Sequence, residues 1–212
     1  EIRRKGNIYK GKVSRIEPSL GAAFVNYGAE RHGFLPFKEI SPQFYPEKQN
    51  RNSRLSVSDC LKKDQEILVQ VEKDERGNKG AALTTNISLA GRYLVLMPNN
   101  PKAAGISRRL EGKERDKLKE RIASLNVPES MGLIVRTAGE GKDLEDLKWD
   151  LEYLQRVWEG ISEANTLKNS PILIFKESDI IIRALRDYLK EDIDEIWVDT
   201  EEAFEEASEF VE

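Results

Sequence analysis

Short strand-like runs separated by turns fill residues 7–85, and they limit the possible folds more than any other feature of the sequence. In the first run, NIYKGKVSRIE, successive side chains fall into two alternating sets, as they do on the two faces of a strand. A long polar loop, residues 41–56, interrupts the series, and its role is not predicted. The four other runs are GAAFVNYG, RHGFLPF, QEILVQVEKDE and GAALTTNISLAG. Five short antiparallel strands with one long insertion predict a small β-barrel of the OB type.

Strand-like and helical patterns alternate after Gly91. The clearest helix spans residues 143–164, where apolar residues recur at steps of three and four and therefore share one face. Asp143 precedes it as the predicted N-cap. The other predicted helices are 111–125, 179–190 and 201–211, and the predicted strands are GRYLVLMP, the run from Leu133 to Val135, PILIF and EIWVD. Such alternation favours a mixed α/β layer packed beside the barrel, and thus an α+β chain.

Charge is divided unevenly along the chain, although the net charge is only −4. Residues 1–142 carry 27 Lys and Arg against 17 Asp and Glu, whereas residues 143–212 carry 7 against 21. The basic part is a candidate for binding a polyanion, because Lys and Arg that neutralise phosphates release bound counterions. The alternative is chance variation of a solvated surface. A single cysteine excludes an internal disulfide, and an intracellular, reducing setting is expected.

Two phenylalanines of the predicted barrel are candidates for nucleic-acid binding. OB folds stack bases of single strands on exposed aromatic rings beside a positive groove. Phe24 and Phe34 lie in consecutive runs, and their rings share one face if these strands are adjacent. Lys79, in the turn RGNKG, offers a cation for a passing phosphate. The alternative for both rings is a place in the core, and His32 is expected to be a hydrogen-bonded residue at the rim.

Arg136 and Thr137 end an apolar run and are followed by small residues in the stretch VRTAGEG. Arg presents a planar fork of donors that matches phosphate oxygens two at a time, and Thr adds a neutral hydroxyl donor. Small residues let backbone N–H groups approach an anion as well. The pattern favours a phosphate site, and a solvated strand end is the open alternative.

Long stretches of the sequence resemble one known family. The stretch NIYKGKVSRIEPSLGAAFVNYGAERHGFLP closely resembles the RNA-binding OB-fold domain of the bacterial ribonuclease E/G family. The match continues in DERGNKGAALTTNISLAGRYLVLMPNN, GISRRLEG and MGLIVRTAG, so that it covers essentially the whole chain. The resemblance implies that Phe24 and Phe34 contact RNA bases, and that Lys79 and Arg108 lie along the RNA path.

A second subdomain of that family is called the 5′ sensor, and the resemblance extends to its motifs. It implies that Arg136 and Thr137 hold the 5′-monophosphate of an RNA, and that Gly91 and Val95 line the same pocket. The expected domains are a barrel at 1–85, a 5′ sensor at 86–180 and the beginning of an RNase H-like subdomain at 181–212. Cleavage in the family uses a magnesium site in a later DNase-I-like domain, and a zinc is shared between subunits.

No catalytic or metal-binding residue is predicted within this chain. Its acidic end, DTEEAFEEASEF, follows helix spacing and is expected to be a solvated helix face. The resemblance implies part of a cytoplasmic endoribonuclease of RNA processing and mRNA decay, inactive in isolation. Association with the inner membrane, through regions other than these residues, is a further expectation for the parent protein. Its expected partner is single-stranded RNA with a 5′-monophosphate. The full-length protein is expected to form homo-oligomers, with other degradation-complex proteins as further partners. The alternative is a protein-docking module that binds RNA incidentally.

Overall fold

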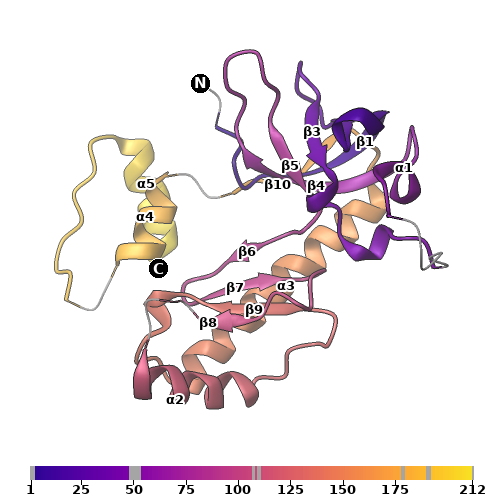
Figure 1. The fold of residues 1–212 in the computed structure, drawn as a ribbon. Helices are drawn as coiled ribbons and strands as arrows, with labels where there is room; N and C mark the ends of the chain where they lie inside the picture. The colour runs from indigo at the N-terminus through magenta and orange to yellow at the C-terminus, as the bar shows by residue number, and fades with distance from the viewer. Residues whose placement is uncertain are drawn as a thin grey trace.

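Two β-sheets and a long connecting helix organise the chain (Figure 1). The computed structural model describes residues 3–47, 54–106, 108, 111–177, 180–189 and 192–211. The first sheet has the order β10-β1-β2-β3-β5-β4, and a further pairing of β1 with β4 closes it into a barrel. Its strands are β1 (Ile8–Glu17), β2 (Ala22–Asn26), β3 (Gly33–Pro36), β4 (Glu66–Lys73), β5 (Ala82–Thr84) and β10 (Ile172–Phe175).

The five-stranded OB-type barrel is confirmed, with one difference in strand direction. β3 and β5 pair in parallel, whereas the other pairings in this sheet are antiparallel. Alternate residues of the strands, including Val13, Val25 and Leu35, are fully buried and fill the barrel. Short helical turns join or precede the strands: η1 (Pro18–Leu20), η2 (Phe37–Glu39), η3 (Pro42–Phe44) and α1 (Val57–Cys60).

The second sheet has the order β6-β7-β9-β8 and a core of its own. Its strands are β6 (Leu89–Ala90), β7 (Leu94–Met97), β8 (Gly105–Ile106) and β9 (Gly132–Val135), accompanied by α2 (Gly112–Ala123) and α3 (Leu144–Leu167). Leu94 and Leu96 of β7 are fully buried, in one core with the buried leucines of α3. The predicted helix at 143–164 is thus confirmed, as is its N-cap, since the Asp143 carboxylate accepts a hydrogen bond from the Asp146 N–H at 2.9 Å.

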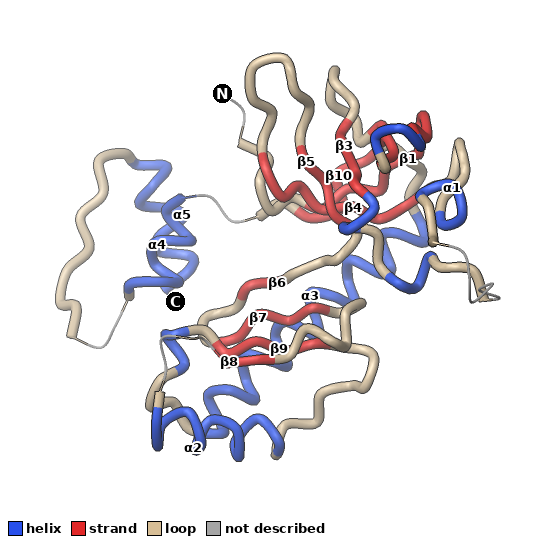
Figure 2. The backbone as a smooth tube through the Cα atoms, viewed as in Figure 1, coloured by secondary structure: helices blue, strands red, loops and turns tan. Residues whose placement is uncertain are grey.

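Helix α3 connects the two sheets. Figure 2 shows it running from the second sheet to the barrel. At its C-terminal end, Lys10 of β1 donates to the backbone carbonyls of Asn165 and Lys168, both at 2.8 Å. The chain then returns to the barrel as β10, which pairs antiparallel with β1. The helix therefore fixes the orientation of the second sheet relative to the barrel.

One predicted strand, GAALTTNISLAG, is wrong as a single element, because β5 and β6 belong to different sheets. In the segment between β5 and β6, polar side chains accept hydrogen bonds from backbone N–H groups. The Ile87 N–H donates to Asn99 Oδ1 at 3.1 Å, and the Ser88 N–H donates to Gln70 Oε1 at 2.8 Å. These bonds replace ladder partners and let the chain leave the barrel.

The predicted strand EIWVD, residues 195–199, is also wrong, because the structure has no strand there. No described strand lies alongside it, and the Trp197 side chain is 88% exposed. The flanking helices are present as predicted, as α4 (Ile180–Tyr188) and α5 (Glu201–Val211), and they pack against each other (Figure 1). The ends of the predicted helix 179–190 lie outside the described residues.

A buried carboxylate of α3 holds the turn between β6 and β7. Asp150 is 1% exposed, and it accepts hydrogen bonds from the backbone N–H groups of Arg92, Tyr93 and Leu94 at 2.9–3.0 Å. A Cβ atom at Gly91 would lie 2.5 Å from both carboxylate oxygens, so only glycine fits at this close approach. One side chain thus holds three successive backbone N–H groups and requires glycine at the residue before them.

Asp150→Ala is expected to lower the free energy of unfolding by about 3 kcal/mol. The substitution leaves three backbone donors without their acceptor, and each buried unsatisfied donor costs on the order of 1–3 kcal/mol. Urea denaturation of the variant measures the loss. Glu152→Ala removes an exposed carboxylate from the same helix and is expected to stay within about 0.5 kcal/mol of the parent. Equal losses in the two variants would contradict this account of the turn.

Candidate nucleic-acid interface

An aromatic pair lies on the barrel where the sequence places two candidate residues. Phe24 of β2 and Phe34 of β3 are direct cross-strand partners. Their ring centroids are 5.8 Å apart with an interplanar angle of 65°, an edge-to-face arrangement. Both side chains are only partly buried, so they are not enclosed in the barrel core. The predicted placement of both rings on one face is confirmed, and a ring surface remains open to a ligand.

Arg15 belongs to this surface, although sequence reasoning did not select it. It lies opposite Phe24 in the ladder between β1 and β2, and its guanidinium carbon is 4.6 Å from the Phe24 ring centroid. Glu17 also pairs with this guanidinium at 2.9 Å. A cation at the face of an aromatic ring is attracted by the ring quadrupole. The register of the first two strands is the signal that would have found Arg15.

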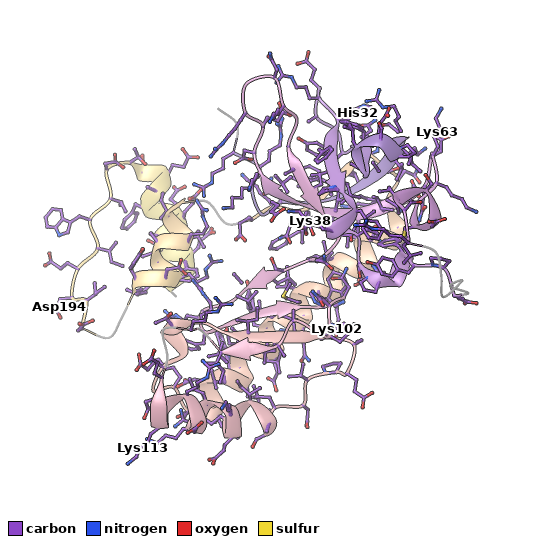
Figure 3. All side chains as sticks on the ribbon, in the orientation of Figure 1. His32, Lys38, Lys63, Lys102, Lys113 and Asp194 are labelled. Atoms are coloured by element: carbon purple, nitrogen blue, oxygen red, sulfur yellow. The ribbon has the colours of Figure 1, made fainter. Side chains whose placement is uncertain are left out.

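His32 extends the same surface at the edge of the barrel (Figure 3). Its Nδ1 is 2.8 Å from Ser14 Oγ, and the Ser14 hydroxyl donates to the Phe24 carbonyl at 3.0 Å. Because the hydroxyl has only one proton to donate, it accepts from Nδ1, and His32 carries a proton there. His32 is therefore a hydrogen-bonded rim residue, as expected.

Lys79 is exposed in a tight turn beside β3. Arg76 and Lys79 pair across the turn, with the Lys79 N–H donating to the Arg76 carbonyl at 2.9 Å. The segment after the turn is held against β3, since the Phe34 N–H donates to the Ala81 carbonyl at 2.8 Å. A cation thus lies near the strand that carries one of the two rings.

Arg108 is exposed and follows β8, a strand of the second sheet.

Arg136 is anchored at the end of β9, where η4 (Thr137–Gly139) begins. Its backbone N–H donates to the Tyr93 carbonyl at 2.7 Å. Its Nη1 donates to the Gly91 carbonyl at 2.6 Å, and its Nη2 forms an ion pair with Asp187 of α4 at 2.7 Å. Burial raises the pKa of Asp187, but the hydrogen bonds and charges of Arg136 and Arg186 together outweigh this, so the pKa lies below its usual value.

A cavity of about 1320 Å³ surrounds the Arg136 side chain and is called the Arg136 cavity below. Exposed Thr137 and the ring of Tyr93 form part of its wall, and the Lys142 ammonium lies 5.3 Å from that ring centroid. The charged residues that line the cavity are Arg92, Arg136, Glu140, Lys142, Arg186, Asp187 and Asp192. Asp187 and Arg186 come from a helix about 50 residues away in sequence, and no local pattern would have found them.

Gly91 and Val95 take different places relative to Arg136. Gly91 contacts it through its carbonyl oxygen, in the turn that Asp150 holds. Val95 is partly buried on β7, between the buried Leu94 and Leu96, and lies directly opposite Ile134 of β9. Ile134 lines the Arg136 cavity. The structure therefore brings Arg136, Thr137 and Gly91 together, with Val95 on the neighbouring strand.

No helix among the described residues is long and apolar enough to cross a membrane. Within the described ranges, no three His, Cys, Asp or Glu side chains gather as a metal site requires.

Comparison with known proteins matches both parts of the chain. Residues 3–86 match the S1 RNA binding domain, and residues 88–212 match the Ribonuclease E/G family. Ribonuclease E of Haemophilus influenzae is 59% identical over 98% of this chain and 22% of its own length. Ribonuclease E of Escherichia coli K12 is 59% identical over 95% of this chain and 19% of its own length. Ribonuclease G of Salmonella typhimurium is 39% identical over 97% of this chain and 42% of its own length.

Proposed function

The chain belongs to the ribonuclease E/G family, and from this we propose that it is the RNA-binding and 5′-end-sensing portion of a ribonuclease E-like endoribonuclease. Its barrel is an S1 RNA-binding domain, and the remainder is part of the ribonuclease E/G region. The chain spans about a fifth of the length of the ribonuclease E relatives. RNA cleavage in processing and mRNA decay, with magnesium and zinc as cofactors, would then depend on parts of the whole protein other than these residues.

The observation that carries the proposal is the anchored guanidinium of Arg136. The Gly91 carbonyl holds Nη1, while Nη2 faces an anionic oxygen, that of Asp187. A carboxylate and a phosphate both present oxygens to such a fork. The surrounding cavity, about 1320 Å³, is larger than a phosphate alone requires. We therefore propose that Arg136 binds the 5′-monophosphate, with Thr137 as an additional donor and Gly91 and Val95 bordering the terminal nucleotide.

The barrel would bind the nucleotides that come after the 5′-terminal one. Its affinity would not depend on whether the RNA carries a 5′-phosphate. Phe24 and Phe34 provide open ring surface for bases, and Lys79 provides a cation near β3. Arg15 adds a cation at the Phe24 ring, and Arg108 contributes charge from the second sheet. Stacking is tolerant of sequence, because every base has a π-face. The two surfaces together would select RNA by its 5′ end and not by its sequence.

In this proposed function, residues 1–85 form the RNA-binding barrel, residues 86–180 form the 5′ sensor and residues 181–212 begin an RNase H-like subdomain. Hydrolysis is assigned to none of them, and the isolated chain is expected to be inactive. Homo-oligomers and contacts with other degradation proteins are assigned to the whole protein.

A protein-docking role is the second candidate, and exposed apolar side chains in the acidic part favour it. Trp197 is 88% exposed and Phe204 is 62% exposed. The dependence of binding on salt concentration distinguishes RNA binding from protein docking. Binding through phosphates weakens steeply as the salt concentration rises, whereas apolar docking does not.

Arg136→Ala is expected to abolish the preference for 5′-monophosphorylated RNA over an identical RNA with a 5′-hydroxyl. The phosphate loses its charged partner, while the barrel still binds both RNAs. Fluorescence anisotropy with the two RNAs measures the ratio of affinities. Unchanged affinity for the 5′-hydroxyl RNA shows that the variant is folded. Lys113→Ala removes an exposed cation of α2 that does not line the Arg136 cavity, and it should keep the preference (Figure 3). A preference that survives in Arg136→Ala would refute the sensor assignment.

Phe24→Ala is expected to weaken binding of 5′-monophosphate and 5′-hydroxyl RNA equally, by about 1–3 kcal/mol, because a stacked base loses its platform. Titrations of both RNAs measure the change. Phe204→Ala removes an exposed phenylalanine from acidic α5 and should leave both affinities unchanged. A loss confined to one of the two RNAs would show that Phe24 does not act as a general stacking platform.

A further inference from the structure

We propose that Asp187 is an internal competitor of the RNA 5′-phosphate, and that the phosphate binds Arg136 by displacing the Asp187 carboxylate and with it helix α4. This inference rests on the proposed function, because it concerns the same arginine. Asp187 would then set the affinity for the 5′ end, and helix α4 would move when the phosphate binds.

The guanidinium of Arg136 has two sides with different partners. Nη1 donates to the Gly91 carbonyl at 2.6 Å, a bond inside the second sheet, where Asp150 holds the turn. Nη2 pairs with Asp187 Oδ1 at 2.7 Å, a bond to a different element, α4. We place an incoming anion on this second side, because Asp187 borders the Arg136 cavity there. In the free chain the second side is already occupied by an oxygen anion.

The ion pair is partly shielded from water, since the side chains of Arg136 and Asp187 are 24% and 31% exposed. It is therefore less screened than a fully exposed surface pair. At the same time the Asp187 carboxylate borders the cavity and is not enclosed. A ligand can reach the pair from solvent without opening the core.

Helix α4 packs against α5, and polar contacts that can be exchanged link it to its other neighbours. It has nine residues, Ile180–Tyr188, which is too short for an isolated helix to be stable. Beside the Asp187 pair, Arg186 Nη1 donates to the Ala90 carbonyl at 3.3 Å, and Arg186 pairs with Glu177 at 3.4 Å. Tyr188, the last residue of α4, is 73% exposed. The Asp187 pair is thus the shortest of these polar links between α4 and its surroundings.

Charge determines which RNA ends can displace the carboxylate. A terminal monophosphate carries about −1.5 to −2 near neutral pH and offers three acceptor oxygens, whereas Asp187 offers a single charge. The monophosphate therefore competes successfully for Nη2. A 5′-hydroxyl carries no charge and leaves the Arg136–Asp187 pair intact. Binding of the correct end would consequently be coupled to release of α4, and binding of the wrong end would not.

Asp187→Asn is expected to tighten binding of 5′-monophosphate RNA on the order of tenfold, as when a site that is open in about one molecule in ten becomes fully open. The affinity for the matching 5′-hydroxyl RNA should not change. Fluorescence anisotropy on the chain and its variant measures both. Glu140→Gln is the matched control, because it removes one negative charge from the same cavity. It should tighten binding less than Asp187→Asn does.

Hydrogen exchange of the parent chain provides a second measurement that needs no variant. Amide exchange in residues 181–188 should accelerate when 5′-monophosphate RNA binds, and it should stay the same with 5′-hydroxyl RNA. Unchanged exchange with both RNAs would overturn the competition. A 5′-monophosphate affinity that is equal or weaker in Asp187→Asn would also overturn it, and would make Asp187 a residue that positions Arg136.

The outcomes also separate this inference from the proposed function. If the parent chain prefers the 5′-monophosphate and Asp187→Asn binds it no more tightly, only the competition fails. If neither protein distinguishes the two RNA ends, the sensor assignment fails together with the competition.

Discussion

The buried carboxylate of Asp150 is the interaction on which the geometry around Arg136 depends. It lies on α3 and accepts three successive backbone N–H groups of the β6–β7 turn. These bonds direct the Gly91 carbonyl toward Arg136 and place the Tyr93 carbonyl where it accepts the Arg136 N–H. The guanidinium is therefore positioned by a helix residue that does not touch it. An arginine on a flexible loop would lose side-chain entropy on binding a phosphate, whereas Arg136 is already ordered.

The same helix links the barrel to the sheet that carries the Arg136 cavity. The N-terminal half of α3 carries Asp150, and its C-terminal end accepts hydrogen bonds from Lys10 of the barrel. The backbone then passes into β10, which extends the barrel sheet. The barrel surface and the Arg136 cavity are consequently held on one framework. For an RNA that contacts both, part of the ordering cost is met before binding, because α3 already holds the barrel and the second sheet in one arrangement.

Patterns within short stretches predicted the barrel, the helices and the aromatic pair, because they depend on neighbours in sequence. The leucine spacing of 143–164 identified α3, and the adjacency of two strands brought Phe24 and Phe34 to 5.8 Å. Features that depend on distant partners were not predicted. EIWVD has the composition of a strand, but a strand also needs a neighbour to accept its hydrogen bonds. Asp187 is separated from Arg136 by 51 residues, and nothing in its local sequence indicates an ion pair.

The acidic character of the C-terminal third gains a physical meaning at the Arg136 cavity. Arginine and lysine from the basic part line this cavity, and Asp187 and Asp192 from the acidic part face them. A purely basic pocket would attract any segment of an RNA backbone, because internal phosphates also carry negative charge. Under the proposed function, an acidic partner inside the pocket would weaken binding of an internal phosphodiester, whose single charge gains little by replacing Asp187. A terminal monophosphate has more charge and more acceptor oxygens, and it would replace Asp187 more readily. The uneven charge along the sequence is thus consistent with selection of an end over the continuous chain.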